Sequence, residues 1–283
     1  MPGKFKPQRE ILKEYFDLDR LPHLWCPGCG IGTGLGCLIR AADAAGVPRD
    51  DLCIVTGIGC SGLTYNYTRL QAVHGPHGRA LTIATGLKVA NPRLKVVVPM
   101  GDGDCAAIGG NHLLHAAKRN IDVVAVVFNN SNYGMTGGQF SPTTPLGART
   151  STTPYGHIEK PLDIARVAMA AGATYVARCT TYHVRQLIRL LKGAFEHKGF
   201  SLVEVMTQCP QIFGRLNKWS SPVQMLLDFK ERAIPIQGAA KLTPAELEQR
   251  IPIGVLVQRE APEFTETVWE LTREVEKRQV GSG

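Results

Sequence analysis

Two acidic residues follow a run of β-branched residues in the segment VVVPMGDGDC, and an apolar helical pattern begins directly after them. Asp102 and Asp104 alternate here with Gly101 and Gly103. Neighbouring carboxylates repel each other unless a positive charge lies near them. The glycines let the backbone approach a ligand closely, and a helix N-terminus favours phosphate. Because a carboxylate beside a phosphate needs a bridging cation, we expect Mg²⁺, which binds a few protein oxygens together with phosphate oxygens.

A second polar pair ends the next predicted strand, VVAVVFNN. Neighbouring parallel strands bring their carboxyl ends together, so Asn130 can approach Asp102 and supply a neutral oxygen to a hard cation. The alternative for Asp102 is an acid that caps the following helix, which needs no ligand. For Asp104, a hydrogen bond near the phosphate and a helix-capping role are both open.

Four of the eight cysteines fall where a metal site can form. Cys26 and Cys29 form a C-x2-C hook. Cys60 lies in the Gly-rich turn GIGCSG, and Cys209 ends the last strand before a proline. Four thiolates bind zinc or a [4Fe–4S] cluster, and chemistry alone leaves both open. The other four cysteines lie among apolar residues, and we assign them to the core: Cys37, Cys53, Cys105 and Cys179.

The elements that position these residues alternate between apolar strands and helices. LKVVVPM and IDVVAVVF are apolar without alternation, which is typical of parallel strands covered on both faces. Helices and strands continue to alternate as far as SLVEVMTQC. We therefore predict an α/β fold with a doubly wound, mostly parallel sheet. Ligands bind such sheets at the carboxyl ends of the strands, where the Gly-rich turns can converge on one site.

The pattern divides the chain into three parts. Residues 1–25 form a polar N-terminal arm, 26–209 form the α/β domain, and 210–283 form a C-terminal extension in which the strand pattern weakens. Within the extension, LTPAELEQR carries the signature of a helix start with a capping box. We expect the extension to wrap a neighbouring chain or to cover the site.

The composition is that of an ordinary globular protein, with 283 residues, 44% hydrophobic and 20% charged. The formal net charge of +8 suits an anionic cofactor or an acidic protein partner. We expect no nucleic-acid partner, because the Lys and Arg residues are scattered and no known nucleic-acid motif occurs. No run approaches the about 20 apolar residues that span a bilayer, and the first residues lack the apolar core of a signal peptide. These features predict a cytoplasmic protein whose thiols stay reduced.

The acidic turn and the paired asparagines resemble a known cofactor motif. GDG followed, 28 positions after its Asp, by the second residue of NN is similar to the thiamine-diphosphate motif. The resemblance implies that Asp102 and Asn130 bind Mg²⁺ through their side chains, and that Asn132 binds it through its backbone carbonyl.

A larger set of motifs resembles one enzyme family. CPGCG, GIGCSG, HGPHGRALTIATGLKVANP, GDGD, NN and YGMTGGQFSPTTP occur in the order found in the β subunit of the 2-oxoacid:ferredoxin oxidoreductases. The resemblance covers about residues 20–215 and is closest to the 2-oxoglutarate branch. It implies that Cys26, Cys29, Cys60 and Cys209 bind one [4Fe–4S] cluster.

The family implies a thiamine-dependent redox reaction. Thiamine diphosphate attacks the keto carbon of a 2-oxoacid, CO₂ leaves, the cluster takes electrons singly for ferredoxin, and coenzyme A carries off the acyl group. With 2-oxoglutarate the product is succinyl-CoA, and the reverse direction, which the sequence leaves open, is the carbon fixation of a reductive TCA cycle. The implied cofactor-binding residues are Gly59, Cys60, Ser61, Gly101, Asp102, Gly103, Asp104, Asn130, Tyr133, Gly134 and Thr136.

Two histidines lie in VHGPHGR, a Gly/Pro loop that we expect to face the site. We predict a catalytic role toward substrate or cofactor for His74 and His77, with simple surface exposure as the alternative. Arg79 and Lys88 either meet a substrate carboxylate or are solvated surface residues.

One functional residue of thiamine enzymes has no match in this chain. A Glu on a separate domain usually activates the aminopyrimidine, but no Glu here is a convincing match, since the candidates lie in polar helices or in the tail. By resemblance, that Glu comes from an α subunit. We therefore predict half of an active site, inactive alone, in an (αβ)₂ heterotetramer that passes electrons to an acidic ferredoxin.

Other interpretations stay open. Within the family, pyruvate and branched-chain 2-oxoacids are alternative substrates, and Gly137 stands where some 2-oxoglutarate-type relatives carry Lys. A second interpretation is a subunit of a thiamine-dependent decarboxylase without a redox centre, in which the cysteines hold zinc or nothing. A third is a zinc-stabilised binding module, which leaves the pairing of Asp102 with Asn130 unexplained.

Overall fold

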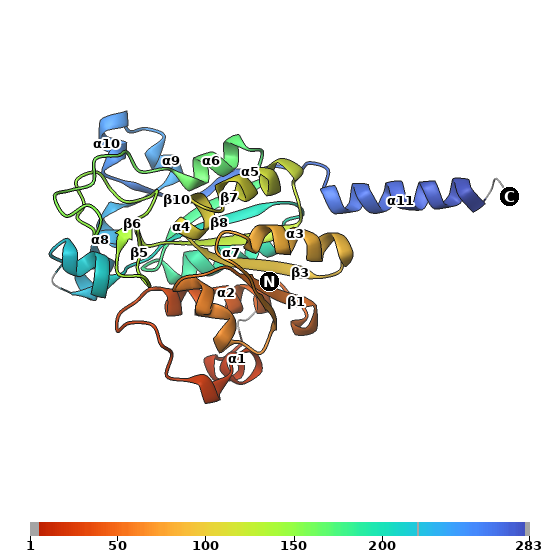
Figure 1. The fold of residues 1–283 in the computed structure, drawn as a ribbon, viewed down its shortest axis with the longest axis horizontal. Helices are drawn as coiled ribbons and strands as arrows, with labels where there is room; N and C mark the ends of the chain where they lie inside the picture. The colour runs from red at the N-terminus through yellow and green to blue at the C-terminus, as the bar shows by residue number, and fades with distance from the viewer. Residues whose placement is uncertain (1–5, 220, 281–283) are drawn as a thin grey trace.

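An eight-stranded sheet runs through the computed structural model, which describes residues 6–219 and 221–280 (Figure 1). The strand order is β2-β1-β3-β4-β8-β7-β10-β9. The first six strands in this order are parallel to their neighbours, and β10 is antiparallel to β7. The strands are β1 (Leu52–Thr56), β2 (Gln71–His74), β3 (Lys95–Gly101), β4 (Val123–Asn129), β7 (Tyr175–Thr180), β8 (Ser201–Met206), β9 (Ala233–Pro235) and β10 (Ile251–Gln258), and a separate small sheet pairs β5 (Asn132–Tyr133) with β6 (Gln139–Phe140).

Helices cover both faces of the sheet and form two hydrophobic cores (Figure 1). Side chains of α1, α2 and α7 pack on one face, and those of α3, α5 and α6 pack on the other. This arrangement confirms the predicted α/β fold with a doubly wound, mostly parallel sheet. The helices are α1 (Gln8–Tyr15), α2 (Ile31–Ala44), α3 (Ala80–Ala90), α4 (Asp102–Ala106), α5 (Gly110–Arg119), α6 (Ile164–Ala170), α7 (Val184–Glu196), α8 (Pro222–Arg232), α9 (Ile236–Ala239), α10 (Pro244–Glu248) and α11 (Phe264–Val280).

The uniformly apolar segments became the central strands, as their pattern predicts. Every residue of β4 is buried, and β3 is buried except at its two ends. A strand that is covered on both faces needs apolar side chains in both directions, which removes the usual alternation.

The topology switches direction at β1. This strand lies between β2 and β3, so the chain leaves β1 toward one side of the sheet and returns on the other side. The loops after β1 and β3 therefore diverge and leave a crevice at their carboxyl ends, which is where open α/β sheets bind ligands. The register pairs Gly101 with Phe128, so the turns after β3 and β4 begin side by side.

The two ends of the chain differ from the predicted arm and extension. Ile11 and Tyr15, on the apolar face of the amphipathic α1, are buried in the core beside α2, and so is Phe16, directly after the helix. In the predicted extension, β10 joins the main sheet, although Pro252 and Gly254 interrupt its strand pattern. The expected capping box is confirmed at the start of α10.

The last helix, α11, projects away from the rest of the molecule (Figure 1). Near its start, Trp269 Nε1 donates a hydrogen bond to the carbonyl of Val89 at the end of α3. In the described part of the chain, no helix is both long and apolar enough to cross a membrane.

A buried ion cluster closes the amino ends of β3 and β4. Lys88 Nζ lies 2.8 Å from Asp122 Oδ2, and Lys95 Nζ lies 3.1 Å from Asp122 Oδ1. Lys88 also donates to the carbonyls of Pro92 and Leu94. Both roles predicted for Lys88 are wrong: the side chain is 4% exposed and lies at the end of the sheet opposite the crevice.

Replacing Asp122 by Asn should lower the free energy of unfolding by about 3 kcal/mol, because it leaves two largely buried ammonium groups without a counter-charge. Urea unfolding of the wild type and Asp122→Asn at pH 7 measures the difference. A decrease in the free energy of unfolding of less than ~0.5 kcal/mol, as at an ordinary surface position, would show that the ion cluster is not stabilising.

The same pair of proteins tests the sign of the pH dependence. Burial by itself raises the pKa of Asp122, but Lys95 and Lys88 outweigh burial and hold that pKa below its ordinary value of 3.8. The stabilisation is therefore present above about pH 4 and is lost as the pH falls through the folded-state pKa. The difference between the wild type and the variant should shrink over that acidic range.

Candidate functional site

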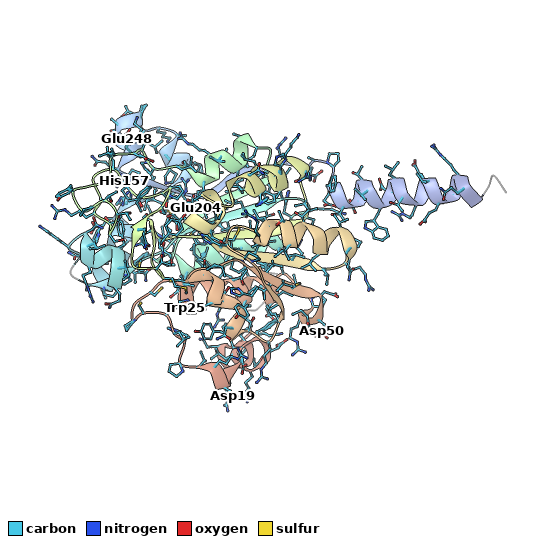
Figure 2. All side chains as sticks on the ribbon, viewed as in Figure 1. Asp19, Trp25, Asp50, His157, Glu204 and Glu248 are labelled. Atoms are coloured by element: carbon cyan, nitrogen blue, oxygen red, sulfur yellow. The ribbon has the colours of Figure 1, made fainter. Side chains whose placement is uncertain are left out.

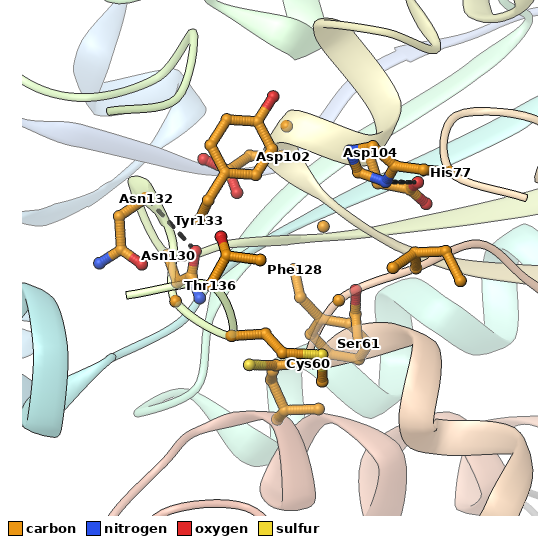
Figure 3. Close-up of a pocket in the computed structure, with 17 residues that line it drawn as sticks. Cys60, Ser61, His77, Asp102, Asp104, Phe128, Asn130, Asn132, Tyr133 and Thr136 are labelled. Carbon is orange, nitrogen blue, oxygen red and sulfur yellow. Dashed lines mark hydrogen bonds and ion pairs between the residues drawn. The ribbon is translucent and has the colours of Figure 1, made fainter. Parts of the chain in front are cut away.

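A cavity of about 270 Å³ lies at the carboxyl ends of β1, β3 and β4 (Figure 3). All eleven residues predicted to bind the cofactor line it, together with Asn132 and His77. The sequence does not predict its apolar lining, because neither an apolar residue within a helix or strand nor a single one in a turn shows that it faces a cavity. The lining residues that the prediction missed are Ile31, Ile58, Phe128 and Met135.

Asp102 is 1% exposed and begins α4. The helix-capping alternative is wrong, because Gly101 occupies the cap position. One carboxylate oxygen, Oδ2, accepts hydrogen bonds from Ser141 Oγ at 2.5 Å and from Thr143 Oγ1. Burial raises the pKa of Asp102 to about 6, and the two hydroxyl donors oppose that rise. The hydroxyl groups therefore occupy Oδ2, while Oδ1 faces the Asn130 amide.

The Asn130 amide faces two further oxygens. One of its terminal atoms lies 3.3 Å from Asp102 Oδ1 and 2.7 Å from the backbone carbonyl of Asn132. If that atom is nitrogen, it donates to both oxygens; if it is oxygen, three oxygens converge on one point. Three converging oxygens are stable only around a cation, and carboxylate, amide and carbonyl oxygens are the ligands that hard divalent cations take.

Asn132 provides a second sign that this turn contacts something outside the chain. Its side chain is 3% exposed, yet neither its Oδ1 nor its Nδ2 has a hydrogen-bond partner among the described residues. Buried polar atoms are normally paired, so an orphaned amide in a cavity wall indicates a ligand contact.

Asp104 does not cap the helix, which was one of its two predicted roles. It contacts His77 instead. Its Oδ1 accepts a hydrogen bond from the Gly78 amide at 2.6 Å and lies 2.6 Å from His77 Nδ1 (Figure 3). Burial raises the pKa of Asp104, while the Gly78 amide and His77 oppose the rise. Orientation through Nδ1 leaves His77 Nε2 for a bound molecule.

The other predicted histidine and arginine are not brought to the cavity. His74 is exposed, stacks on Tyr65 with ring centroids 4.6 Å apart, and pairs through Nδ1 with Thr56 Oγ1 at 2.9 Å. Arg79 Nη1 donates to the carbonyl of Ile108 at 3.2 Å. His74 and His77, which are close together in VHGPHGR, therefore lie in two different environments.

Gly103 gives room to a side chain as well as to a ligand. A Cβ at this position would lie 2.2 Å from the Tyr133 ring. The aromatic ring thus packs directly on the backbone of the acidic turn, and only glycine permits that contact.

The four predicted cluster ligands gather beside this cavity. A Cβ on Gly134 would lie 3.5 Å from Cys209 Sγ and 3.7 Å from Cys60 Sγ, so both sulfurs flank the same turn. Burial raises the pKa of Cys29 to about 12, and the thiols of Cys209, Cys60 and Cys26 add to the rise. Burial also raises the pKa of Cys60 to about 11.

Backbone contacts hold the C-x2-C hook against the end of β8. The Cys29 amide donates to the Cys26 carbonyl, and the Gly30 amide donates to the carbonyl of Gln208, next to Cys209. The four cysteines assigned to the core are buried there, as predicted: Cys37, Cys53, Cys105 and Cys179.

Comparison with known proteins identifies the family. The family model described as "Thiamine pyrophosphate enzyme, C-terminal TPP binding domain" matches residues 57–205. This range holds every cavity residue except Ile31. The 2-oxoglutarate synthase subunit KorB of Methanothermobacter thermautotrophicus is 46% identical over 92% of this chain and 91% of its own length. The KorB of Archaeoglobus fulgidus is 47% identical over 93% and 95%. The chain belongs to the β-subunit family of the 2-oxoacid:ferredoxin oxidoreductases.

A solved structure agrees with this assignment over nearly the whole fold. The 2-oxoglutarate:ferredoxin oxidoreductase of Magnetococcus marinus, determined with 2-oxoglutarate, coenzyme A and succinyl-CoA bound, matches with a TM-score of 0.83 and 33% identity. The match covers 93% of this chain and 90% of the Magnetococcus chain. The resemblance inferred from the short motifs is confirmed.

Proposed function

We propose that this chain is the subunit of a 2-oxoglutarate:ferredoxin oxidoreductase that anchors thiamine diphosphate through Mg²⁺ and carries a [4Fe–4S] cluster. The enzyme interconverts 2-oxoglutarate, coenzyme A and oxidised ferredoxin with succinyl-CoA, CO₂ and reduced ferredoxin. The observation that carries the proposal is the convergence of Asp102 Oδ1, the Asn130 amide and the Asn132 carbonyl beside four neighbouring thiols.

Mg²⁺ fits the three oxygens around Asn130. In octahedral coordination with bonds of about 2.1 Å, adjacent ligand oxygens lie roughly 3 Å apart. The separations of 3.3 and 2.7 Å bracket that value. Asp102 can bind only through Oδ1, since Ser141 and Thr143 occupy Oδ2, and the cation favours the ionised carboxylate that burial alone disfavours.

A [4Fe–4S] cluster fits the thiols better than a single zinc ion. A tetrahedral zinc site brings its sulfurs within about 3.8 Å of one another, given Zn–S bonds of about 2.3 Å. Among the described residues, no three His, Cys, Asp or Glu side chains gather in this way. A [4Fe–4S] cluster takes one thiolate on each of its four iron atoms. It therefore accepts cysteine sulfurs that lie farther apart than zinc ligands do. Its positive charge also offsets the desolvation that keeps Cys29 and Cys60 protonated.

The chain's own residues position the reaction. When bound, thiamine diphosphate supplies the carbon nucleophile and electron sink for 2-oxoacid decarboxylation, and the cluster takes single electrons. Asp104 orients His77, whose Nε2 can exchange a proton with a bound substrate or cofactor. Ile58 and Met135 form apolar walls at the cavity and are 40% and 48% exposed, which suits cover by a second protein.

That second protein is the α subunit, in an (αβ)₂ heterotetramer. It supplies the Glu that activates the aminopyrimidine, since no Glu of this chain lines the cavity. The net charge of +8 favours encounter with an acidic ferredoxin, and we place the enzyme in the cytoplasm.

The two cofactor sites should fail independently. In the purified two-subunit enzyme, Asp102→Ala should abolish Mg²⁺-dependent retention of thiamine diphosphate and leave the visible iron–sulfur absorption intact. Cys209→Ala should do the reverse, and Cys105→Ala, a core cysteine, should change neither. Cofactor content and absorption spectra measure all three variants; loss of both signals in Asp102→Ala would remove the support for separate sites.

The substrate and the need for a partner are tested by turnover. The two-subunit enzyme, given coenzyme A and a low-potential acceptor, should oxidise 2-oxoglutarate in preference to pyruvate and branched-chain 2-oxoacids. The isolated chain should show no turnover with any of them. Full activity of the chain alone would refute the half-site, and preference for pyruvate would move the enzyme to another branch.

The two histidines provide a matched pair. His77→Gln should lower kcat by ~10²-fold or more, the usual contribution of a positioned acid–base group, without weakening thiamine diphosphate binding. His74→Gln should leave kcat near the wild-type value, because His74 lies outside the cavity lining. Equal effects of the two variants would argue against the role of the pair formed by His77 and Asp104.

A further inference from the structure

Glu204 is a buried carboxylate in the centre of the sheet. It lies on β8, between β4 and β7, and is 2% exposed. Figure 2 shows it in the interior of the molecule, whereas the acidic residues Asp19, Asp50 and Glu248 lie at the periphery. It does not line the cavity, and neither the family motifs nor the proposed chemistry accounts for it.

Both oxygens of Glu204 have fixed partners. Arg178 Nε on the neighbouring strand β7 donates to Oε2 at 2.7 Å. Asn129 Nδ2, at the end of β4, donates to Oε1 at 2.8 Å. A buried ion pair of this kind contributes little net stability compared with apolar residues of the same volume, so stability alone does not explain its presence.

The second partner connects Glu204 to the cavity. Because Glu204 accepts from Asn129 Nδ2, Asn129 Oδ1 must point the other way. There it accepts a hydrogen bond from the Ser131 amide at 3.2 Å and lies 2.9 Å from Thr143 Oγ1. Thr143 in turn donates to Asp102 Oδ2.

The Ser131 contact fixes the shape of the turn. Ser131 has a φ of 61°, a left-handed conformation that a non-glycine residue adopts only when its surroundings hold it. Asn130 and Asn132 lie on either side of it. The Asn129 amide, together with the Thr144 hydroxyl that donates to the Ser131 carbonyl at 2.7 Å, therefore fixes where Asn130 and Asn132 point.

We propose that Glu204 is a positioning residue for the magnesium-binding turn. Held by Arg178, it fixes the orientation of the Asn129 amide, and through Asn129 it holds the Ser131 turn in the arrangement that presents Asn130 and Asn132 to the cation. The inference rests on the proposed function, because it assumes that Mg²⁺ binds at that turn.

The hydrogen-bond directions make the role testable. In Glu204→Gln the new amide carbonyl faces the Arg178 cation, so its NH₂ faces Asn129 Nδ2, donor against donor. Asn129 must then turn and present its own NH₂ to the Ser131 amide. In Asn129→Asp the new carboxylate faces that of Glu204. In the double variant the two groups are exchanged: the new amide donates to the new carboxylate, whose other oxygen again accepts from Ser131.

The experiment measures the Mg²⁺ concentration for half-maximal retention of thiamine diphosphate by the purified two-subunit enzyme. Glu204→Gln should raise it by ~10–100-fold, the usual effect of losing a group that orients a metal ligand. Asn129→Asp should also raise it. The double variant should recover most of the lost affinity, and the visible iron–sulfur absorption should stay unchanged in all three.

Asp122→Asn is the matched control. It removes a buried ion pair at the opposite end of the same sheet, so it should cost stability without changing the Mg²⁺ requirement. An equal change in this control would reduce Glu204 to a general stabilising residue. A double variant no better than the single ones, or tighter binding in Asn129→Asp alone, would also overturn the inference.

Failure of the inference can be told apart from failure of the proposed function. If Asp102→Ala abolishes thiamine diphosphate retention but Glu204→Gln leaves the Mg²⁺ requirement unchanged, the metal site stands and the positioning role falls. If Asp102→Ala has no effect on retention, the metal site itself falls, and with it the basis of the inference.

Discussion

The structure depends on how a carboxylate is kept in an apolar interior. The sheet does this in two different ways at its two ends. At the amino ends of β3 and β4, two lysines neutralise Asp122. At the carboxyl end of β3, the groups that act on Asp102 are hydroxyls and backbone amides, which carry no charge. Among the described residues, the desolvated carboxylate therefore has no counter-charge, which favours the binding of an external cation.

The parallel sheet makes this arrangement possible. Strand order and register bring the turns after β1, β3 and β4 together, so the acidic turn, the asparagine turn and the Cys60 turn share one cavity. Gly134 lies between the Asn132 side chain and the sulfurs of Cys60 and Cys209, so the two proposed cofactor sites share this turn as a common wall. Under the proposed function, a subunit built in this way would hold a redox cluster close to the carbon chemistry and leave the open side of the cavity for a partner protein.

Much of this was predictable because it is encoded locally. The apolar runs that became β3 and β4 and the spacing of Asp102 and Asn130 are visible in the sequence. Partners distant along the chain were not: Ser141 Oγ reaches Asp102 across 39 positions, and a hydroxyl in a loop carries no signal of that contact. The sequence suggests a surface or substrate-binding role for Lys88. Its burial depends on pairing with Asp122, which is distant along the chain and leaves no local pattern. The strand β10 was missed because Pro252 and Gly254 break its pattern.

In the proposed site, the cavity binds a diphosphate only through a cation held by Asp102, Asn130 and Asn132. The most direct test is calorimetric titration of the cofactor-free two-subunit enzyme with thiamine diphosphate, in Mg²⁺ and after removal of divalent cations with a chelator. We expect binding in Mg²⁺ and none after chelation, with binding restored when Mg²⁺ is added back. Equally tight binding in the absence of divalent cations would contradict it.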